Sequence, residues 1–503
     1  MGNCLRCLFT VALFSSLQLI AQVEEERLDS YIQESISNFE LQGLAISIVK
    51  NKEVVYQKAF GVANQKTKRK LTTDATFGIA SLSKAFTATA IGMLVDDGKL
   101  KWTDKVSDYI EAFDLSDDYV ASQITVEDLL AHRSGFDTFD GDLLWYNSNY
   151  TRKEIIERFA NYPMTYDFRT NYGYQNIMFI IAGKIVTQVS GMTWDKFIKE
   201  RIFKPLEMNN SFTSIDGYPK DLNIAEPHVK GRLDKVRNYD NSGGAAAISS
   251  NVEDLTKWIK FWLNKGIVNG DTLLEEASYK NITKLQTPID PSSFDNSNGI
   301  HFKGYGLGWF LMDYQGAKVF HHGGGLPGYI SKIFICPEMK LGAIVLSNGE
   351  TSLPAALMYQ LIDEYKGNAI REDWSQLYLD YSNRAEASDE EDQKKRLEAR
   401  KPKIKSQFSN EDLVGTYVDK VYGEASVTEE GGKLVFTMLP SKELFTSEMT
   451  HWHYNTYQIK FKDGFLPNGY ITFSQDSNGK VSGLKIDLPN PDFHFYKMEF
   501  IKD

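Results

Sequence analysis

Cysteine is scarce in this sequence, with three of 503 residues: Cys4, Cys7 and Cys336. The first two lie in an N-terminal segment that we expect to be removed, and the single remaining thiol excludes an intramolecular disulfide. A chain of this length can bury cores that are stable without cross-links. Cys336 lies in the apolar run KIFICP, so we expect a small buried side chain and not a reactive one.

Positively charged residues are also fewer than negatively charged ones. Lys and Arg number 56 against 67 Asp and Glu, which gives a formal net charge of -11. Nucleic-acid-binding proteins concentrate cations on one face to displace counterions from phosphates. The charge balance therefore argues against a nucleic-acid partner.

The N-terminal apolar run, from Leu8 to Ile20, is shorter than the roughly 20 residues that a membrane-spanning helix needs. One cation, Arg6, precedes it, and Ala21 and an acidic stretch follow, which is typical of a signal peptide. We expect residues 1–21 to be cleaved from a bacterial protein that is exported to the periplasm or secreted, with no stable membrane span afterwards. A short membrane anchor is the alternative.

Apolar residues make up 42% and aromatic residues 13% of the chain, enough for more than one core. From Gly43, the alternating text GLAISIVKNKEVVYQKAFG predicts a β-hairpin. Helical patterns follow over 81–95, 125–132 and 176–189, and strand patterns return over 305–348 before a closing helix. The predicted fold class is α/β (α+β), with an antiparallel sheet built from both ends of the domain, flanking helices and a helical subdomain.

The composition changes after Gly367. Residues 383–405 are almost wholly charged and indicate a solvated linker helix. From Phe408, short strand patterns alternate with turns such as EEGGK, KDG and PNG. We therefore divide the chain into a first domain over 23–370, a charged helical linker over 371–406 and a small β-barrel or β-sandwich domain over 407–503.

The first candidate for chemistry is Ser81, three residues before Lys84 at the start of a predicted helix. Residues three apart share a helix face, so the Lys84 amine can activate the Ser81 hydroxyl as a nucleophile. The helix start also directs N–H groups at an oxyanion formed there. The same S-x-x-K spacing occurs in a strand or around a turn at Ser47, Ser477 and Ser482, which lack this context.

Tyr-x-Asn is the second pattern, because a phenol near an ammonium can relay protons and an amide can hold the lysine. It occurs at Tyr174, Tyr239 and Tyr381. Tyr174 and Asn176 stand at a loop-to-helix junction, a favourable place for catalytic side chains, whereas Tyr381 belongs to the charged linker. An ordinary packed aromatic is the alternative for Tyr174.

Two adjacent histidines, His321 and His322, precede three glycines between two strand patterns. Glycines beside a strand let a substrate backbone approach closely. No zinc-ligand spacing accompanies the histidines, so we expect no metal and no cofactor. His451 and His453 alternate on a strand, and we expect a structural role for them.

In this order, SLSK, YQN and HGG resemble the three motifs of the serine β-lactamase and penicillin-binding protein superfamily, on the side of class C β-lactamases and D-alanyl-D-alanine carboxypeptidases. ITVEDLLAHRSGF, RIFKPLEMNNSF and GGAAAISSNVEDLTKW resemble that family too, so the similarity runs from about Leu41 to Tyr365. The tail resembles a β domain that often follows such hydrolases. The resemblance implies a β-lactamase/transpeptidase-like fold.

The resemblance also implies roles. Ser81 would be the acylated nucleophile, Lys84 its base, and Tyr174 a second proton-transfer group. The substrate and oxyanion positions it implies are Asn176, His322, Gly324 and Gly325, with the N–H groups of Ser81 and Gly325 forming the oxyanion hole. His322 would replace the lysine of the Lys-Thr-Gly motif, and a histidine is only partly charged near neutral pH, which disfavours penicillinase activity.

The sequence thus predicts an exported serine hydrolase that cleaves a small amide or ester, of carboxypeptidase, D-amino-acid peptidase or carboxylesterase type. Its expected partner is a small-molecule, peptide or ester substrate of cell-wall or glycan origin. The alternatives are a catalytically idle peptidoglycan- or glycan-binding protein on the same fold and a weak β-lactamase.

Overall fold

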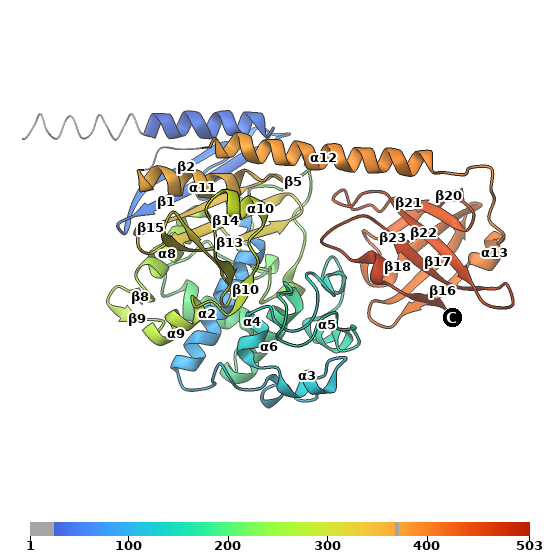
Figure 1. The fold of residues 1–503 in the computed structure, drawn as a ribbon, viewed down its shortest axis with the longest axis horizontal. Helices are drawn as coiled ribbons and strands as arrows, with labels where there is room; N and C mark the ends of the chain where they lie inside the picture. Colours follow the sequence, from blue (N-terminus) through green and yellow to red (C-terminus); the bar gives the residue numbers. More distant parts are fainter. Residues whose placement is uncertain (1–24, 368–371) are drawn as a thin grey trace, which may run out of the picture.

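The fold is described by a computed structural model over residues 25–367 and 372–503. The predicted signal peptide, residues 1–21, lies outside the described residues. Figure 1 shows a sheet with helices on both sides, a helical region next to it, and an all-β domain that a long helix connects to the rest. The predicted fold class is confirmed.

A nine-stranded antiparallel sheet forms the centre of the first domain. Its spatial order is β10 (Thr287–Ile289), β11 (Lys303–Tyr305), β12 (Phe310–Tyr314), β13 (Ala317–Leu326), β14 (Tyr329–Cys336), β15 (Leu341–Ser347), β1 (Gly43–Lys50), β2 (Glu53–Asn64) and β3 (Arg69–Lys70). Leu44 of β1 lies opposite Ser347 of β15. The N-terminal hairpin thus joins strands from the end of the domain, as the sequence predicts.

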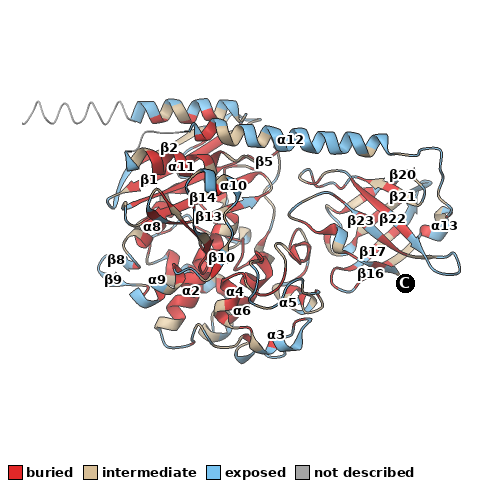
Figure 2. Ribbon diagram, viewed as in Figure 1, coloured by how far each residue is buried: buried red, intermediate tan, exposed pale blue. Residues whose placement is uncertain are grey.

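Side chains of β1 alternate between two cores, one on each face of the sheet. Leu44, Ile46 and Ile48 pack with α11 (Leu353–Lys366) and the helix over residues 25–38. Ala45 and Val49 pack on the other side, with α8 (Val252–Leu263) and α2 (Ser83–Asp96). Because each fully buried aliphatic side chain contributes about 1.5–3 kcal/mol, these two faces fix the sheet between its helices (Figure 2).

The helical region has the ends that its sequence predicts. α4 (Val126–Leu130) begins with a capping box between Thr125 and Asp128. α6 (Asn176–Ser190) ends at Gly191, whose φ of 70° suits a residue without a Cβ. Among the described residues, no single helix is long and apolar enough to cross a membrane, although α6 and the adjoining 194–203 helix reach that length together with a bend of 76°.

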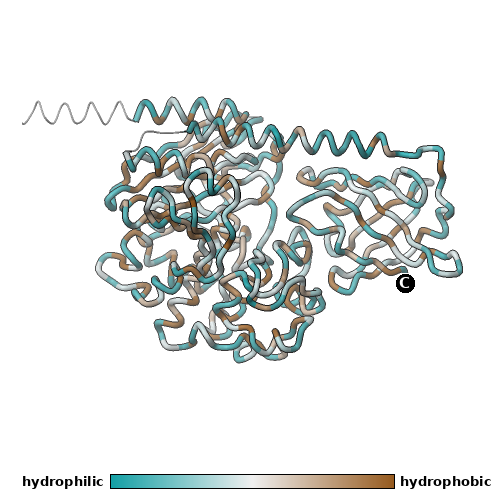
Figure 3. Tube along the Cα trace, in the orientation of Figure 1, coloured by the Kyte–Doolittle hydropathy of each residue, from teal (hydrophilic) through white to brown (hydrophobic). Residues whose placement is uncertain are grey.

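α12 (Trp374–Glu398) is the predicted linker helix. Only Trp374 and Ser375 are buried in it, and the remainder is exposed and hydrophilic (Figures 2 and 3). Another nine-stranded antiparallel sheet follows, so the expected all-β domain is present. Its order is β19 (Thr446–Glu448), β18 (Lys433–Met438), β17 (Gly423–Glu430), β16 (Gly415–Asp419), β24 (Phe500–Lys502), β23 (Val481–Asp487), β22 (Gly469–Gln475), β21 (Thr456–Ile459) and β20 (Thr450–His453).

Buried polar contacts hold the two domains together. Asp463 of the C-terminal domain is 1% exposed and accepts hydrogen bonds from Tyr146 at 2.7 Å and Arg237 at 2.9 Å. Asp140 of the first domain is also buried, and it accepts hydrogen bonds from Tyr162 and His494. Both sets of hydrogen bonds involve the loop over residues 140–146, so the position of this loop depends on the C-terminal domain.

We expect Asp463→Ala to weaken the docking of the two domains, because it leaves Arg237 as a buried cation with a single remaining partner. Breaking a buried ion pair costs about 3–5 kcal/mol. The unfolding midpoint should fall, and protease should cut faster in the segment 399–405. Asp487→Asn is the control, since its ion pair with Arg396 is exposed and contributes little. Equal midpoints for the two variants would contradict this role of Asp463.

Candidate active site

Ser81 stands in a tight turn that leads into a long buried helix. The 3-10 turn Ala80–Leu82 runs directly into α2. Ala80 has a φ of 52°, a left-handed conformation that costs free energy for a residue with a Cβ and that recurs at functional sites. The first N–H groups of a helix lack partners within the helix. The turn therefore offers both a hydroxyl and free N–H donors at one point.

Lys84 is fully buried beneath Ser81. In its charged form Nζ donates to Ser81 Oγ at 3.1 Å, to the Ala245 carbonyl at 3.2 Å and, by a short hydrogen bond, to Asn176 Oδ1; in its neutral form the lone pair can face Ser81. Burial lowers the pKa of Lys84 strongly from 10.5, because the charged form loses its hydration. A neutral amine at this distance can take the proton of the Ser81 hydroxyl.

Asp142 stands behind Asn176 and was not predicted from the sequence. Asn176 Nδ2 donates to Asp142 Oδ2 at 2.6 Å, so the amide bridges the Lys84 amine and the carboxylate. Burial raises the pKa of Asp142, and the Asp142 charge in turn raises the pKa of Lys84. No local pattern marks Asp142 in the text GDLL, since its role depends on a helix 34 residues further along the chain.

Tyr174 completes the group around the nucleophile. The Lys84 Nζ lies 4.7 Å from the centre of the Tyr174 ring, and the phenol hydrogen bonds with the Ser81 hydroxyl. Burial raises the pKa of Tyr174, so the phenol keeps its proton. Backbone bonds from Tyr174 N to Thr138 Oγ1 and from Phe139 N to Tyr174 O fix the residue before α6 begins.

Of the two histidines, His322 faces the nucleophile. Its ring centre is 6.1 Å from that of Tyr174, whereas His321 points to the opposite face of β13 and contacts Lys332 at 2.9 Å. Nε2 of His322 lies 3.0 Å from the Tyr305 hydroxyl, and Nδ1 lies 2.5 Å from the Gly323 carbonyl. These contacts fit a neutral ring in which Nδ1–H donates to Gly323 and Nε2 accepts from Tyr305.

His322 differs in charge from the sequence-based expectation of a partly charged ring. Burial and the nearby Lys84 lower the pKa of His322 to about 3, so the ring is neutral near pH 7 and not partly charged. His322 can hydrogen bond a substrate or position Tyr305, but it supplies no cation.

The glycines belong to the strand itself and not to a loop between strands. β13 continues through Gly323, Gly324 and Gly325 to Leu326, and a two-residue turn then leads into β14. A Cβ at Gly324 would lie 2.3 Å from the Ile79 carbonyl oxygen, so only glycine fits against the turn that holds Ser81.

The pairing pattern directs the N–H group of Gly325 away from β14. A two-residue hairpin makes Leu326 and Tyr329 a hydrogen-bonded pair, so the next pair, Gly325 and Ile330, is a non-bonded one. On the other side, the pairing of β12 ends with Phe310 opposite His321. The edge of β13 is therefore open at Gly325, as an oxyanion donor or a substrate strand requires.

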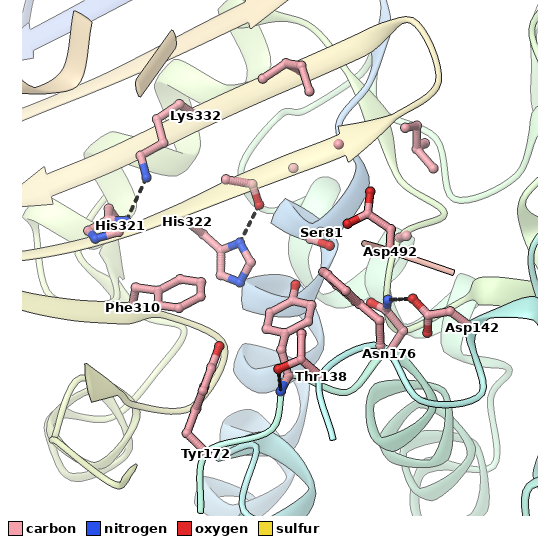
Figure 4. Close-up of a pocket in the computed structure, with 18 of the residues that line it drawn as sticks. Ser81, Thr138, Asp142, Tyr172, Asn176, Phe310, His321, His322, Lys332 and Asp492 are labelled. Atoms are coloured by element: carbon pink, nitrogen blue, oxygen red, sulfur yellow. Dashed lines mark hydrogen bonds between the residues drawn. The ribbon is translucent and has the colours of Figure 1, made fainter. Parts of the chain in front are cut away.

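A cavity of about 860 Å³ joins these parts (Figure 4). All the predicted site residues except Lys84 line it, and Lys84 lies directly beneath Ser81. The C-terminal domain contributes to its wall, a feature that no sequence pattern predicted. The lining residues from that domain are Phe465, Asp492 and Phe493.

The remaining sequence candidates lie elsewhere. Ser47 is buried in β1 beside Gln57 and Thr256, and Tyr239 is buried at a separate small cavity. His451 and His453 bond to backbone atoms of neighbouring loops. Within residues 25–367 and 372–503, no group of three or more His, Cys, Asp or Glu is arranged to hold a metal ion.

Comparison with known proteins agrees with this geometry. A family model described as Beta-lactamase matches residues 24–365, and one described as a domain of unknown function (DUF3471) matches residues 399–502. An octameric penicillin-binding protein homologue from Pyrococcus abyssi has a similar structure, with a TM-score of 0.61 and 22% identity over 95% of this chain and 99% of that one.

The curated relatives share low sequence identity with this chain. An unguisins hydrolase of Aspergillus campestris is 27% identical over 69% of this chain and 67% of its own length. Penicillin-binding protein 4* of Bacillus subtilis is 27% identical over 59% of this chain and 66% of its own length. The chain thus spans about two thirds of the relatives that it matches.

The neutral state of His322 has a consequence for stability that can be measured. An unfolded histidine takes up a proton below about pH 6.5, whereas folded His322 does not until about pH 3. The unfolded state therefore binds more protons, and stability is lost as the pH falls below 6.5, at up to about 1.4 kcal/mol per pH unit. We expect His322→Gln to make this slope shallower by that amount, measured by urea unfolding between pH 6.5 and 5.

His301→Gln is the matched control, because His301 is exposed. Its slope should equal that of the unmodified protein. If stability changes with pH in His322→Gln just as it does in the wild-type protein and in His301→Gln, His322 is protonated in the folded protein.

Proposed function

Since the chain belongs to the Beta-lactamase family, we propose that it is a serine hydrolase that cleaves a small amide or ester through an acyl-Ser81 intermediate. The observation that carries the proposal is the hydrogen bond between the buried Lys84 amine and the Ser81 hydroxyl. Relatives named as hydrolases and penicillin-binding proteins support it.

In the first step, the Ser81 hydroxyl gives its proton to the Lys84 amine while Oγ attacks the substrate carbonyl carbon. The electrons of the carbonyl double bond move to its oxygen, and the N–H groups of Ser81 and Gly325 donate to that oxyanion. Burial of Lys84 favours this step, because a lysine at its ordinary pKa would already hold a proton.

In the second step, the bond to the leaving amine or alcohol breaks. Tyr174 gives its phenol proton to the leaving group and takes one from the Lys84 ammonium, so both residues return to their starting state. The raised pKa of Tyr174 supports this relay, since a phenolate would have no proton to give. Water then attacks the acyl ester by the same groups in reverse, which releases the acid and frees Ser81.

For the substrate, we propose an amide or ester of the carboxypeptidase, D-amino-acid peptidase or carboxylesterase type. A β-lactam carries a carboxylate that is bound well by a permanent cation in the third motif. His322 is neutral there, and Lys332, which also lines the cavity, contacts His321 and has a pKa lowered by burial, so it is not a permanent cation either. Penicillinase activity is therefore expected to be weak.

We also propose that the protein is exported and acts on cell-wall or glycan-derived material. The support is the N-terminal sequence, in which Arg6 precedes a short apolar run and Ala21. N-terminal sequencing of the protein recovered from periplasm and medium should begin shortly after Ala21. Recovery from the cytoplasm with Met1 intact would contradict export.

Ser81→Ala should abolish turnover of an activated ester, because no other hydroxyl contacts the Lys84 amine in the described structure. Loss of a nucleophile of this kind lowers kcat by about 10⁴-fold or more. The variant should keep its fold, and its unfolding midpoint should lie within about 1 °C of the wild-type value.

Ser482→Ala provides the control, since Ser482 has the same spacing to a lysine, Lys485, but lies in β23 away from the cavity lining. A fluorescent phosphonate should label the control protein and not Ser81→Ala. Undiminished turnover by Ser81→Ala would reject the proposal, and an unlabelled but folded wild-type protein would favour an idle binding protein.

A further inference from the structure

A loop of the C-terminal domain forms one wall of the cavity that holds Ser81. The loop follows β23 and is fixed by two hydrogen bonds that the backbone N–H groups of Asp492 and Phe493 donate to the Asn490 side-chain oxygen Oδ1, at 2.9 and 3.0 Å. Figure 4 shows the Asp492 carboxylate directed toward Ser81 and the cavity. A rigid loop thus presents a carboxylate close to the nucleophile.

The Asp492 carboxylate has no hydrogen-bond or ion-pair partner among residues 25–367 and 372–503. Burial raises the pKa of Asp492 and the charge of the nearby His494 only partly offsets this, so the protein holds the carboxylate partly out of water without a hydrogen bond. A buried carboxylate without a hydrogen-bond partner destabilises the folded protein unless a bound ligand donates to it.

Asp142 faces the same cavity from the first domain. It is 3% exposed, and Oδ2 accepts from Asn176, whereas Oδ1 makes no hydrogen bond of ordinary geometry and has the Trp145 side chain beside it. Asp142 and Asp492 line the same cavity, and burial, together with the charge of Asp492, raises the pKa of Asp142. A cation placed between them would stabilise both carboxylates.

Aromatic rings line the same cavity as the two carboxylates. Trp145, Tyr146, Phe465 and Phe493 line the cavity, and the ring centres of Tyr146 and Phe493 are 4.1 Å apart. The faces of aromatic rings attract ammonium groups, and the attraction is strongest where water is excluded. Carboxylates and aromatic rings together are the chemistry that recognises an organic cation.

The cations of the cavity have partners elsewhere. Lys303 forms an ion pair with Asp295, and Lys332 contacts His321. Lys84 is separated from Asp142 by the Asn176 amide. No lysine or arginine of the described chain forms an ion pair with either Asp142 or Asp492.

We propose that Asp142 and Asp492, with Tyr146 and Phe493, form an amine subsite that binds a protonated primary amine of the substrate beside its scissile carbonyl. The inference rests on the proposed function and narrows its substrate class to amides or esters that carry a free amine. The C-terminal domain would then select the substrate of the first domain.

The test compares two covalent probes, a diphenyl phosphonate analogue of alanine with a free amine and its N-acetylated form. In each, Ser81 Oγ bonds to phosphorus and phenoxide leaves. A charge-assisted hydrogen bond is worth about 1.5–3 kcal/mol, so the second-order rate constant of wild-type protein should be about 10- to 100-fold higher for the free amine. Asp492→Asn should bring the ratio of the two rate constants close to one.

Asp487→Asn is the control for loss of one negative charge in the C-terminal domain, since it lies away from the cavity lining and is 63% exposed. It should retain the wild-type ratio. A wild-type ratio close to one, or a ratio that Asp492→Asn leaves unchanged, would overturn the amine subsite.

Binding to Ser81→Ala protein separates this inference from the proposed function. Calorimetry with alaninamide and N-acetylalaninamide requires no reaction at Ser81. Tighter binding of alaninamide that is lost in the Ser81→Ala/Asp492→Asn double variant supports the amine subsite even if neither phosphonate labels the protein. Equal binding of the two amides overturns it.

Discussion

The proposed chemistry depends on one contact, the hydrogen bond between the buried Lys84 amine and the half-buried Ser81 hydroxyl. A lysine without water and without a direct carboxylate partner is driven toward its neutral form. The Asn176 amide stands between Lys84 and Asp142, so the carboxylate influences the amine without forming an ion pair with it. This spacing keeps the amine available as a proton acceptor, which a direct ion pair would prevent.

The same loop that carries Asp142 is the place where the two domains meet. Asp140 bonds to His494 and Tyr146 bonds to Asp463, both across the domain boundary. The polar group behind Lys84 is therefore positioned by contacts that a truncated first domain would lack. In this account, the C-terminal domain contributes to the electrostatics of the nucleophile as well as to the wall of the cavity.

The sequence predicted the parts of the site that depend on local geometry. The Ser81–Lys84 pair follows from helical spacing, and the glycines after the two histidines were predicted to let a substrate backbone approach. The structure adds that Gly324 is also packed against the turn that holds Ser81. Asp142, Tyr305 and Asp492 were missed because their roles arise only when segments far apart in the chain come together. The charge of His322 was misjudged for the same reason, since the burial that keeps the ring neutral comes from Tyr305, Tyr174 and other residues brought together by the fold.

The most direct test is the pKa of Lys84, followed by NMR in protein labelled at the lysine Cε atoms, with the Lys84→Arg variant identifying the resonance. We expect Lys84 to titrate well below the ordinary value of 10.5, because the buried amine loses its hydration. A Lys84 resonance that titrates at or above 10.5 would show a permanently charged ammonium, and Lys84 could then not accept the proton of Ser81.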